Sequence, residues 1–194
     1  MAAMKETILI ILLFLSITFQ GFSQRIEDLS TTDVISGKVI TLGEIPINKG
    51  LILISHSMEC PFADMYANRL KFLISEYSSQ GFAFHLINPS KEENQTPETL
   101  KTFMQESGIS VPYLLDPEQE WTKYFKITKI PEVILITNGE NGFEIAYRGA
   151  FDNNPQAEGS VTDRYFERAI NQILKGQKPG PPQVRAMGCN VKTF

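Results

Sequence analysis

Continuous apolar runs and amphipathic stretches alternate along this chain. Residues 51–55 and 82–87 are short runs of almost only apolar side chains, which is typical of strands buried on both faces. Between them, apolar residues recur every three or four positions from Phe62 to Tyr77 and predict a helix that ends at Gly81. Because parallel strands need a long crossover, strand, helix and strand in this order predict a parallel pair.

The remainder of the chain continues this alternation. Thr96 and Pro97 have the character of a helix cap and a first helical residue, and residues 138–142 are rich in turn formers. The hairpin that this turn closes adds an antiparallel edge, so we predict an α/β fold with a mixed central β-sheet flanked by helices on both faces. The further predicted elements are a strand at 38–42, a helix from 96 to 108, an extended piece at 113–115, a helix opening at 116–118, strands at 133–137 and 143–148, and a helix from Thr162 or Asp163 that ends before Gly176.

The N-terminus has the pattern of an export signal. Lys5 precedes an apolar run at 8–19 that is too short to span a bilayer comfortably, and the small residues Gly21 and Ser23 precede a cleavage position before Gln24. We therefore expect an exported protein, periplasmic or extracellular, that contacts a membrane only through its signal segment before cleavage. The predicted organisation is a signal peptide at 1–23, one domain at 24–178 and a C-terminal tail at 179–194.

Composition and charge narrow the class of partner. With 42% hydrophobic and 21% charged residues in 194 positions, the chain has enough apolar side chains for one soluble domain with a sizeable core. The formal net charge is −4, which argues against nucleic acid because phosphate binding needs a basic surface. We predict no cofactor.

Cys60 is the residue that most clearly indicates a chemical function. It stands where the apolar run at 51–55 leads into the next helix, and Pro61 occupies the expected first helical position. The unpaired N–H groups and the positive dipole end of a helix N-terminus favour a thiolate, whereas the neighbouring charge of Glu59 disfavours it. Since the thiolate is the nucleophilic form of cysteine, thiol redox chemistry is the leading interpretation.

The other cysteine, Cys189, has a role that the residues leave open. It either resolves an intermediate formed on Cys60 or makes a structural disulfide with it, and a free thiol is the remaining alternative. His56 and His85 are the only histidines, and no pair of candidate ligands has metal-like spacing, so we predict no metal site. A copper-handling module built on the cysteines and His56 is a third hypothesis.

Four segments of the chain stand out by their order and spacing. They are Cys60-Pro61-Phe62 with Tyr66 and Arg69, then Lys129-Ile130-Pro131-Glu132-Val133-Ile134-Leu135-Ile136, then Tyr147-Arg148-Gly149 with Asp152-Asn153-Asn154-Pro155, and finally Gly188-Cys189-Asn190-Val191-Lys192. Together they resemble thioredoxin-fold redoxins of the alkyl-hydroperoxide-reductase/thiol-specific-antioxidant (AhpC/TSA, peroxiredoxin-like) family, and the resemblance covers roughly residues 35–194.

The resemblance implies a thioredoxin-like fold and assigns roles to seven residues. The implied catalytic residues are Cys60, Cys189, Ser57 and Pro131, the last as a cis-proline that faces Cys60; the implied substrate-binding residues are Pro61, Ile130 and Arg148. The chain also departs from its relatives. Ala63 replaces the second cysteine of a Cys-x-x-Cys motif, and Leu53 replaces a proline found in peroxiredoxins.

The sequence thus predicts an exported thiol oxidoreductase that acts on disulfides or peroxides through a Cys60 thiolate, resolved by Cys189. Its partners would be a protein or small-molecule disulfide or peroxide and an external thiol reductant. The alternative is a non-catalytic thioredoxin-fold binding module in which Cys60 and Cys189 form a structural disulfide.

Overall fold

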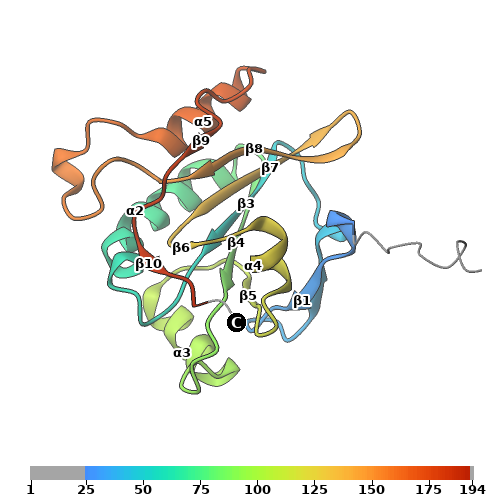
Figure 1. Ribbon diagram of the computed structural model, residues 1–194, viewed down its shortest axis with the longest axis vertical. Coiled ribbons are helices and arrows are strands. Elements are labelled where there is room, and N and C mark those ends of the chain that lie inside the picture. Colours follow the sequence, from blue (N-terminus) through green and yellow to red (C-terminus); the bar gives the residue numbers. More distant parts are fainter. Residues whose placement is uncertain (1–24, 193–194) are drawn as a thin grey trace, which may run out of the picture.

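The computed structural model describes residues 25–192. The predicted signal peptide at 1–23 lies outside the described residues. The chain folds into an α/β architecture around a mixed six-stranded sheet (Figure 1). Within the described part, no helix is both long and apolar enough to cross a membrane.

The strands of the main sheet follow the order β5-β4-β3-β7-β8-β9. The pairs β3–β4, β4–β5 and β8–β9 are parallel, whereas β3–β7 and β7–β8 are antiparallel. The predicted parallel crossover and the predicted hairpin are therefore both confirmed. The strands are β3 (Gly50–Ser55), β4 (Phe82–Asn88), β5 (Tyr113–Leu115), β7 (Val133–Gly139), β8 (Gly142–Gly149) and β9 (Gln183–Val184).

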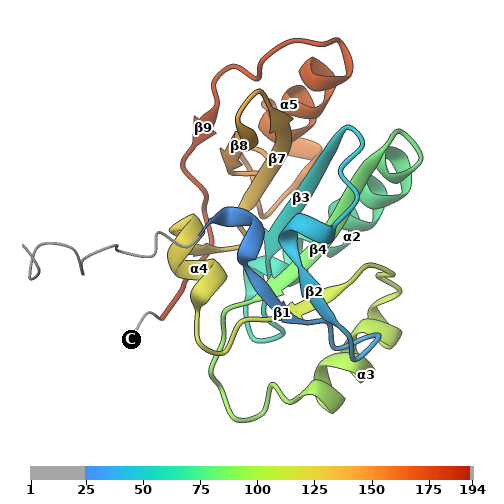
Figure 2. The same ribbon diagram turned by 90° about the vertical axis from the view of Figure 1, so that its right-hand side faces the viewer.

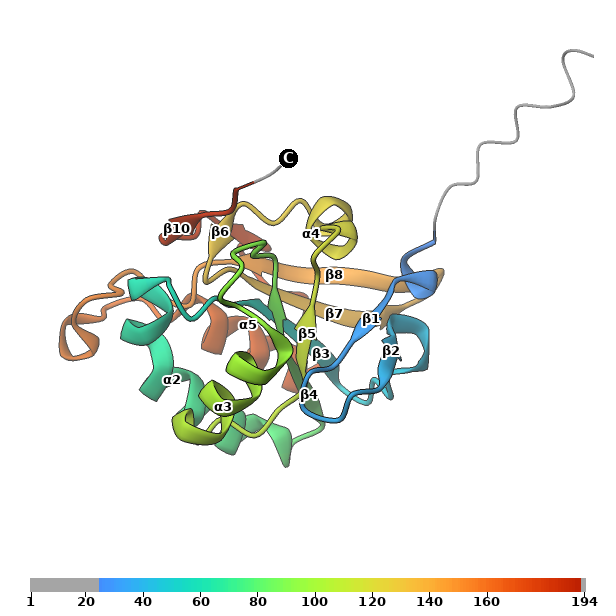
Figure 3. The ribbon, with the colours of Figure 1, turned by 90° about the horizontal axis from the view of Figure 1, so that it is seen from below.

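Helices cover both faces of this sheet, as predicted (Figure 3). Strand β3 is central, and Leu51 through Ile54 each expose 1% or less of their surface, which agrees with a strand buried on both sides. One face packs against three helices and the other against a short helix and the N-terminal hairpin. The helices of the first face are α2 (Pro61–Ser78), α3 (Pro97–Ser107) and α5 (Tyr165–Leu174), and that of the second is α4 (Glu120–Phe125).

The N-terminal segment is more ordered than its sequence suggests. Only the strand at 38–42 was expected, and it is found as β2 (Val39–Thr41), paired antiparallel with β1 (Ser30–Thr32). Short 3₁₀ turns, η1 (Ile26–Asp28) and η2 (Leu42–Glu44), flank this hairpin, which lies beside the sheet in Figure 2. A further turn, η3 (Glu158–Ser160), precedes α5.

Two helices begin later than the sequence predicts. Helix α4 was expected to open at 116–118, but Gln119 has a left-handed backbone with φ 57°, and the helix begins at Glu120, where the Asp116 carboxylate accepts hydrogen bonds from the N–H groups of Trp121 and Thr122. Helix α5 was expected to open at 162 or 163, but Asn153 Oδ1 accepts from the N–H groups of these two residues, and the helix begins at Tyr165.

The C-terminal segment completes the fold with two very short strands. Strand β8 is not the edge that the hairpin predicts, because β9 pairs with it in parallel at Arg148 and Gly149. Further on, β10 (Cys189–Asn190) pairs antiparallel with β6 (Lys129–Ile130), so that Cys189 lies opposite Ile130. The tail thus passes from one side of the molecule to the N-terminal end of α2 (Figure 1).

Candidate functional site

Cys60 lies at the N-terminal end of α2, as its sequence context predicts. It is the residue that caps the helix, with extended backbone, and Pro61 is the first helical residue. Its carbonyl accepts the first hydrogen bond of the helix, from the N–H of Ala63. The side chain of Cys60 is 3% exposed and packs against Ala63 and Ile130. Among the seven predicted site residues, Pro61 is the one that is exposed.

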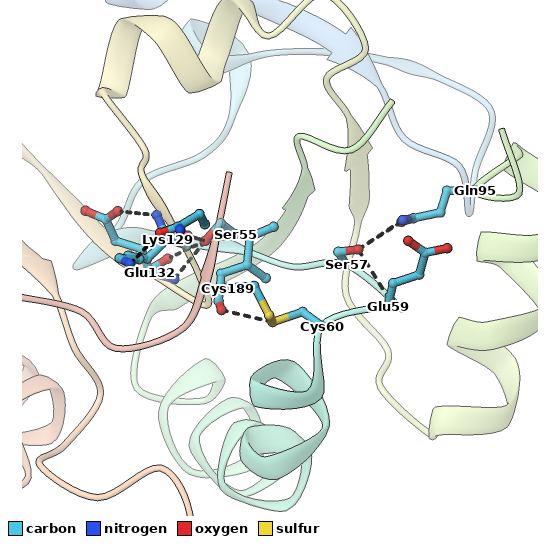
Figure 4. The surroundings of a disulfide bond; sticks show 10 residues. Ser55, Ser57, Glu59, Cys60, Gln95, Lys129, Glu132 and Cys189 are labelled. Atoms are coloured by element: carbon cyan, nitrogen blue, oxygen red, sulfur yellow. Dashed lines mark hydrogen bonds between the residues drawn. A yellow bond between two sulfur atoms is a disulfide. The ribbon is translucent and has the colours of Figure 1, made fainter. Parts of the chain in front are cut away.

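Cys60 and Cys189 are joined by a disulfide (Figure 4). Their Cα atoms are 6.0 Å apart although 129 positions separate them in the chain. This settles the pairing that the sequence left open and excludes a free Cys189 in the oxidised protein. Both cysteines line a cavity of about 520 Å³, together with Ser57 and Ile130. Four of the seven predicted residues therefore meet at one cavity that is open to solvent.

Ile130 and Pro131 form the wall beside the disulfide. The Ile130–Pro131 peptide bond is cis, as the resemblance implies. The carbonyl oxygen of Ile130 lies 3.1 Å from Cys60 Sγ. Ser55 holds this segment, because its hydroxyl donates to the carbonyl of Lys129 at 2.6 Å and accepts from the N–H of Glu132 at 2.7 Å. Pro131 itself is buried and supplies backbone rather than a reactive group.

Glu132 and Arg148 anchor the same segment from its other side. Glu132 is buried although it directly precedes strand β7, with only 5% of its surface exposed. Its carboxylate accepts from the N–H of Thr128 at 3.0 Å and from Arg148 at 2.8 Å. Arg148 also donates to the carbonyl of Lys126 at 3.1 Å. The Arg148 guanidinium thus binds protein groups and is absent from the lining of the cavity.

Ser57 belongs to a buried polar network on the opposite side of the cavity. The amide nitrogen of Gln95 donates to the hydroxyls of Ser57, at 3.0 Å, and Ser90, at 2.9 Å. The amide oxygen of Gln95 accepts from Asn88 at 2.8 Å. Because Gln95 is itself buried, this network fixes the loop between β4 and α3 against the turn that precedes Cys60.

The rim of the cavity carries charges of both signs. The charged residues that line the cavity are Glu59, Glu92, Lys91 and Lys192. Lys192, on the tail, forms an ion pair with Glu92 at 2.6 Å, and the hydrogen bond that its ammonium donates to the Glu92 carboxylate raises the pKa of Lys192. Glu59 Oε1 instead accepts a hydrogen bond from Asn94. The ion pair therefore links the tail to the loop that follows β4, across the mouth of the cavity.

The two histidines are buried, and neither of them lines the cavity. His56 Nδ1 lies 2.9 Å from the hydroxyl of Tyr113, and burial lowers the pKa of His56 to about 4. Burial likewise lowers the pKa of His85 to about 4. Among residues 25–192, no group of three or more histidine, cysteine, aspartate or glutamate side chains is arranged to hold a metal ion.

The Tyr–Arg motif of α2 and the Asp–Asn–Asn–Pro motif after β8 contact each other away from the cavity, and their role is structural. Arg69, on α2, forms a buried ion pair with Asp152 and donates to the carbonyls of Asn154 and Pro155. Tyr66 donates to the same carboxylate at 3.0 Å. These bonds tie α2 to the segment after β8, so the Tyr–Arg and Asp–Asn–Asn–Pro patterns hold the helix that carries Cys60 in place.

Two residues hold the tail in place in a way that sequence reasoning did not predict. A Cβ atom at Gly188 would lie 2.1 Å from the carbonyl oxygen of Ile130, so only glycine allows this approach. Gln119 is 1% exposed, and its amide nitrogen donates to the carbonyls of Pro89 and Lys192. The glycine before Cys189 was visible in the sequence as part of a motif, whereas nothing near Gln119 indicates its contact with the tail.

Comparisons with known proteins agree with this architecture. An uncharacterized conserved protein from Geobacillus kaustophilus superposes with a TM-score of 0.77 at 24% identity, over 88% of this chain and 91% of that one. A hypothetical protein from Sinorhizobium meliloti 1021 gives 0.75 at 27% identity, over 88% and 93%. A thiol-disulfide oxidoreductase from Bacteroides fragilis gives 0.52 at 19% identity, over 64% and 89%. None of the curated proteins matches the chain.

The family is settled by sequence rather than by shape. The sequence profile of the AhpC/TSA family matches residues 23–151, which is about two thirds of the chain and includes β3, Cys60, the cis-proline and the β7–β8 hairpin. The fold that the solved structures share with this chain is thioredoxin-like. The chain therefore belongs to the AhpC/TSA family and has a thioredoxin-like fold.

Proposed function

We propose that this protein is an exported thiol oxidoreductase in which Cys60 is the nucleophile and Cys189 the resolving cysteine. The observation that carries this proposal is the disulfide between them, placed at the N-terminus of α2 and on the wall of an open cavity. A purely structural disulfide has no need of such a position. A redox-active one needs both a helix N-terminus to favour the thiolate and access for a reactant.

The reaction with a disulfide substrate consists of two successive thiol–disulfide exchanges. The Cys60 thiolate attacks one sulfur of the substrate disulfide, the substrate bond breaks, and one substrate thiolate leaves. The Cys189 thiolate then attacks Cys60 Sγ and releases the second substrate thiolate. The substrate has gained two electrons, and the protein has become the Cys60–Cys189 form seen here. An external dithiol returns the pair to the reduced state.

With a peroxide, the first step differs but the product is the same. The Cys60 thiolate attacks a peroxide oxygen, the O–O bond breaks, and an alcohol or water leaves after protonation. The resulting sulfenic acid condenses with the Cys189 thiol, with loss of water, to the same disulfide.

The other site residues support these steps by position. The carbonyl of Ile130, 3.1 Å from Cys60 Sγ, and the cis peptide of Pro131 shape the wall on which a reactant would rest. Ser57, held by Gln95, shapes the opposite wall. We assign Arg148 a positioning role, because its guanidinium holds Glu132 and Lys126 rather than lining the cavity.

A redox titration of the two thiols tests this function. The full mature chain is equilibrated in graded dithiol buffers, alkylated and weighed. We expect the Cys60–Cys189 bond to open at about −150 to −250 mV, the range of working dithiols, and Cys60→Ser to lose all turnover of disulfide and peroxide substrates. A bond that survives below about −300 mV would identify the structural disulfide of a non-catalytic binding module instead.

Export is the second part of the proposal, and it rests on the N-terminal apolar segment and its small residues. Export also suits a protein that holds a disulfide, since reducing compartments disfavour such bonds. The mature protein, isolated from its native host, is expected to begin at Gln24. A cytoplasmic protein that still begins at Met1 would contradict export without affecting the thiol chemistry.

A further inference from the structure

The tail is bound at the site in the way that a partner polypeptide would be. Cys189 and Asn190 pair antiparallel with Ile130 and Lys129, and the N–H of Val191 donates to the carbonyl of Thr128 at 3.0 Å. Figure 4 shows the tail passing beside Cys60, with Cys189 bonded to its sulfur. The oxidised protein thus contains an extended segment added to a strand edge and joined to the nucleophile through a disulfide.

The side chains of the tail are recognised one by one. Asn190 Oδ1 accepts from the ammonium of Lys129 at 2.6 Å. Val191 packs against the apolar cluster formed by Cys60, Ala63 and Ile130. The tail is therefore bound by specific noncovalent contacts as well as by the disulfide.

The backbone of Ile130 and Pro131 leaves space only for glycine at the position before Cys189. A Cβ at Gly188 would meet the carbonyl oxygen of Ile130 at 2.1 Å and the nitrogen of Pro131 at 3.1 Å. These are backbone atoms, and Ser55 and Glu132 hold the segment that carries them. The wall beside Cys60 therefore has no room for a side chain on the residue that precedes an incoming cysteine.

We infer that the β6 edge is a docking site for an extended glycine–cysteine segment of a protein partner, and that the tail is the internal competitor for this site. The preferred segment has glycine before the cysteine, a hydrogen-bond acceptor after it and an aliphatic residue next. This inference rests on the proposed function, because it needs a Cys60 thiol that exchanges disulfides.

The thiol–disulfide exchange with such a partner needs no further oxidant or reductant. A partner thiolate attacks Cys60 Sγ in the oxidised protein, the Cys60–Cys189 bond breaks, and Cys189 leaves as a thiolate. The tail then vacates the β6 edge, and the partner segment takes its place in the mixed disulfide. A second partner thiolate attacks the partner's own cysteine and releases Cys60, so the partner is oxidised and this protein reduced. The reverse sequence reduces an oxidised partner.

The test uses the full chain with Cys189→Ser, which keeps Cys60 and removes intramolecular closure. The probe is a peptide that reproduces residues 185–194, its cysteine carried as a mixed disulfide with 2-mercaptoethanol. Attack by Cys60 releases 2-mercaptoethanol and leaves a peptide adduct that intact-mass measurement counts over time. The matched control peptide differs only by valine at the position of Gly188. A second protein, Gly188→Val with Cys189→Ser, has a tail that no longer fits the edge.

We expect the glycine peptide to form the adduct about ten-fold faster or more than the valine peptide on Cys189→Ser, equivalent to one decade of affinity. We also expect it to react faster with the double variant than with Cys189→Ser, because its competitor is gone. The comparison of peptides on Cys189→Ser stands even if Gly188→Val folds poorly.

Equal rates for the two peptides on Cys189→Ser would overturn the docking site, and equal rates of the glycine peptide on both folded proteins would overturn the competition. Bis(2-hydroxyethyl) disulfide separates these failures from failure of the function. If Cys60 reacts with this small disulfide but does not distinguish the peptides, only the docking inference falls. If Cys60 reacts with neither, the proposed function falls with it.

Discussion

The two last strands of this protein, β9 and β10, are each two residues long, yet they are attached in different ways. Strand β9 joins the main sheet through backbone pairing alone, and the N–H of Arg148 donates to the carbonyl of Pro182 beside it. Strand β10 joins the small β6 edge and adds a disulfide. Both need a glycine where two backbones meet, Gly149 for β9 and Gly188 for β10.

The difference indicates which part of the tail is permanent. The attachment of β9 involves no group that a cellular reductant changes, so it closes the fold under all redox conditions. The attachment of β10 is conditional, because reduction removes its covalent bond and leaves only backbone pairing and side-chain contacts. Arg148 connects the two regions, since its backbone pairs with β9 and its side chain anchors Glu132 beside β6.

The largest expected effect comes from removing the covalent attachment of β10. In the chain-entropy model, a disulfide that closes a loop of this length stabilises a protein by about 5 kcal/mol, so Cys189→Ser should lower the free energy of unfolding by up to about that amount. Urea unfolding of the oxidised protein and of the variant measures it, and reduced wild-type protein should match the variant. A change below about 1 kcal/mol would show that the covalent attachment adds little to folding.

Substitution of the two glycines should separate β9 from β10. Gly149 has φ +126°, and an added Cβ would meet the carbonyl oxygen of Val184 at 1.6 Å. Gly149→Ala should therefore lower the free energy of unfolding by about 3 kcal/mol, because it strains a strand of the main sheet.

Gly188→Ala is the matched control for this change. It should have a smaller effect on urea unfolding but should speed opening of the disulfide by a small thiol, because it displaces only the tail. If the two variants lost equal stability, β10 would be as integral to the fold as β9.

Acid should act on the core rather than on the tail. Burial holds the pKa of His56 near 4, below its ordinary value of 6.5, so the unfolded chain binds a proton more readily than the folded one. Stability from this residue is complete above pH 6.5 and falls as the pH drops towards 4. Between pH 7 and 4.5 the loss amounts to about 2.5 kcal/mol.

Urea unfolding at both pH values measures this loss, and His56→Gln should show a correspondingly smaller drop. The second buried histidine, His85, remains in the variant and provides the internal reference, since its own contribution should persist. An unchanged pH dependence in the variant would mean that the pKa of His56 is the same in the folded and the unfolded protein.

The smallest expected effect concerns the anchor that β9 and β10 share. Glu132→Gln keeps the size of the side chain but removes the charge that faces Arg148, at a distance of 2.8 Å. Because Arg148 is partly exposed, we expect a loss of only about 1–2 kcal/mol. Opening of the disulfide by a small thiol should also accelerate, since the β6 segment is held less firmly. A stability loss without that acceleration would confine Glu132 to a structural role.

Much of the fold was determined by local sequence. The apolar run of β3, the Cys60–Pro61 junction and the spacing of α2 each lie within a few residues, and backbone sterics and side-chain periodicity act over that distance. The same holds for the β7–β8 hairpin, whose turn residues tolerate positive φ. These elements were predicted with nearly correct limits, and Cys60 was recognised from its position at their junction.

Only the tertiary structure decided the pairing of Cys60 with Cys189, the burial of Glu132 and the requirement for glycine at 188. The physical reason is range. Strands of two residues have no periodicity to detect, and the partners that give these residues their roles lie up to 129 positions away. The sequence by itself determined a thiol at a helix N-terminus, whereas chain packing decided which segment occupies the edge beside it.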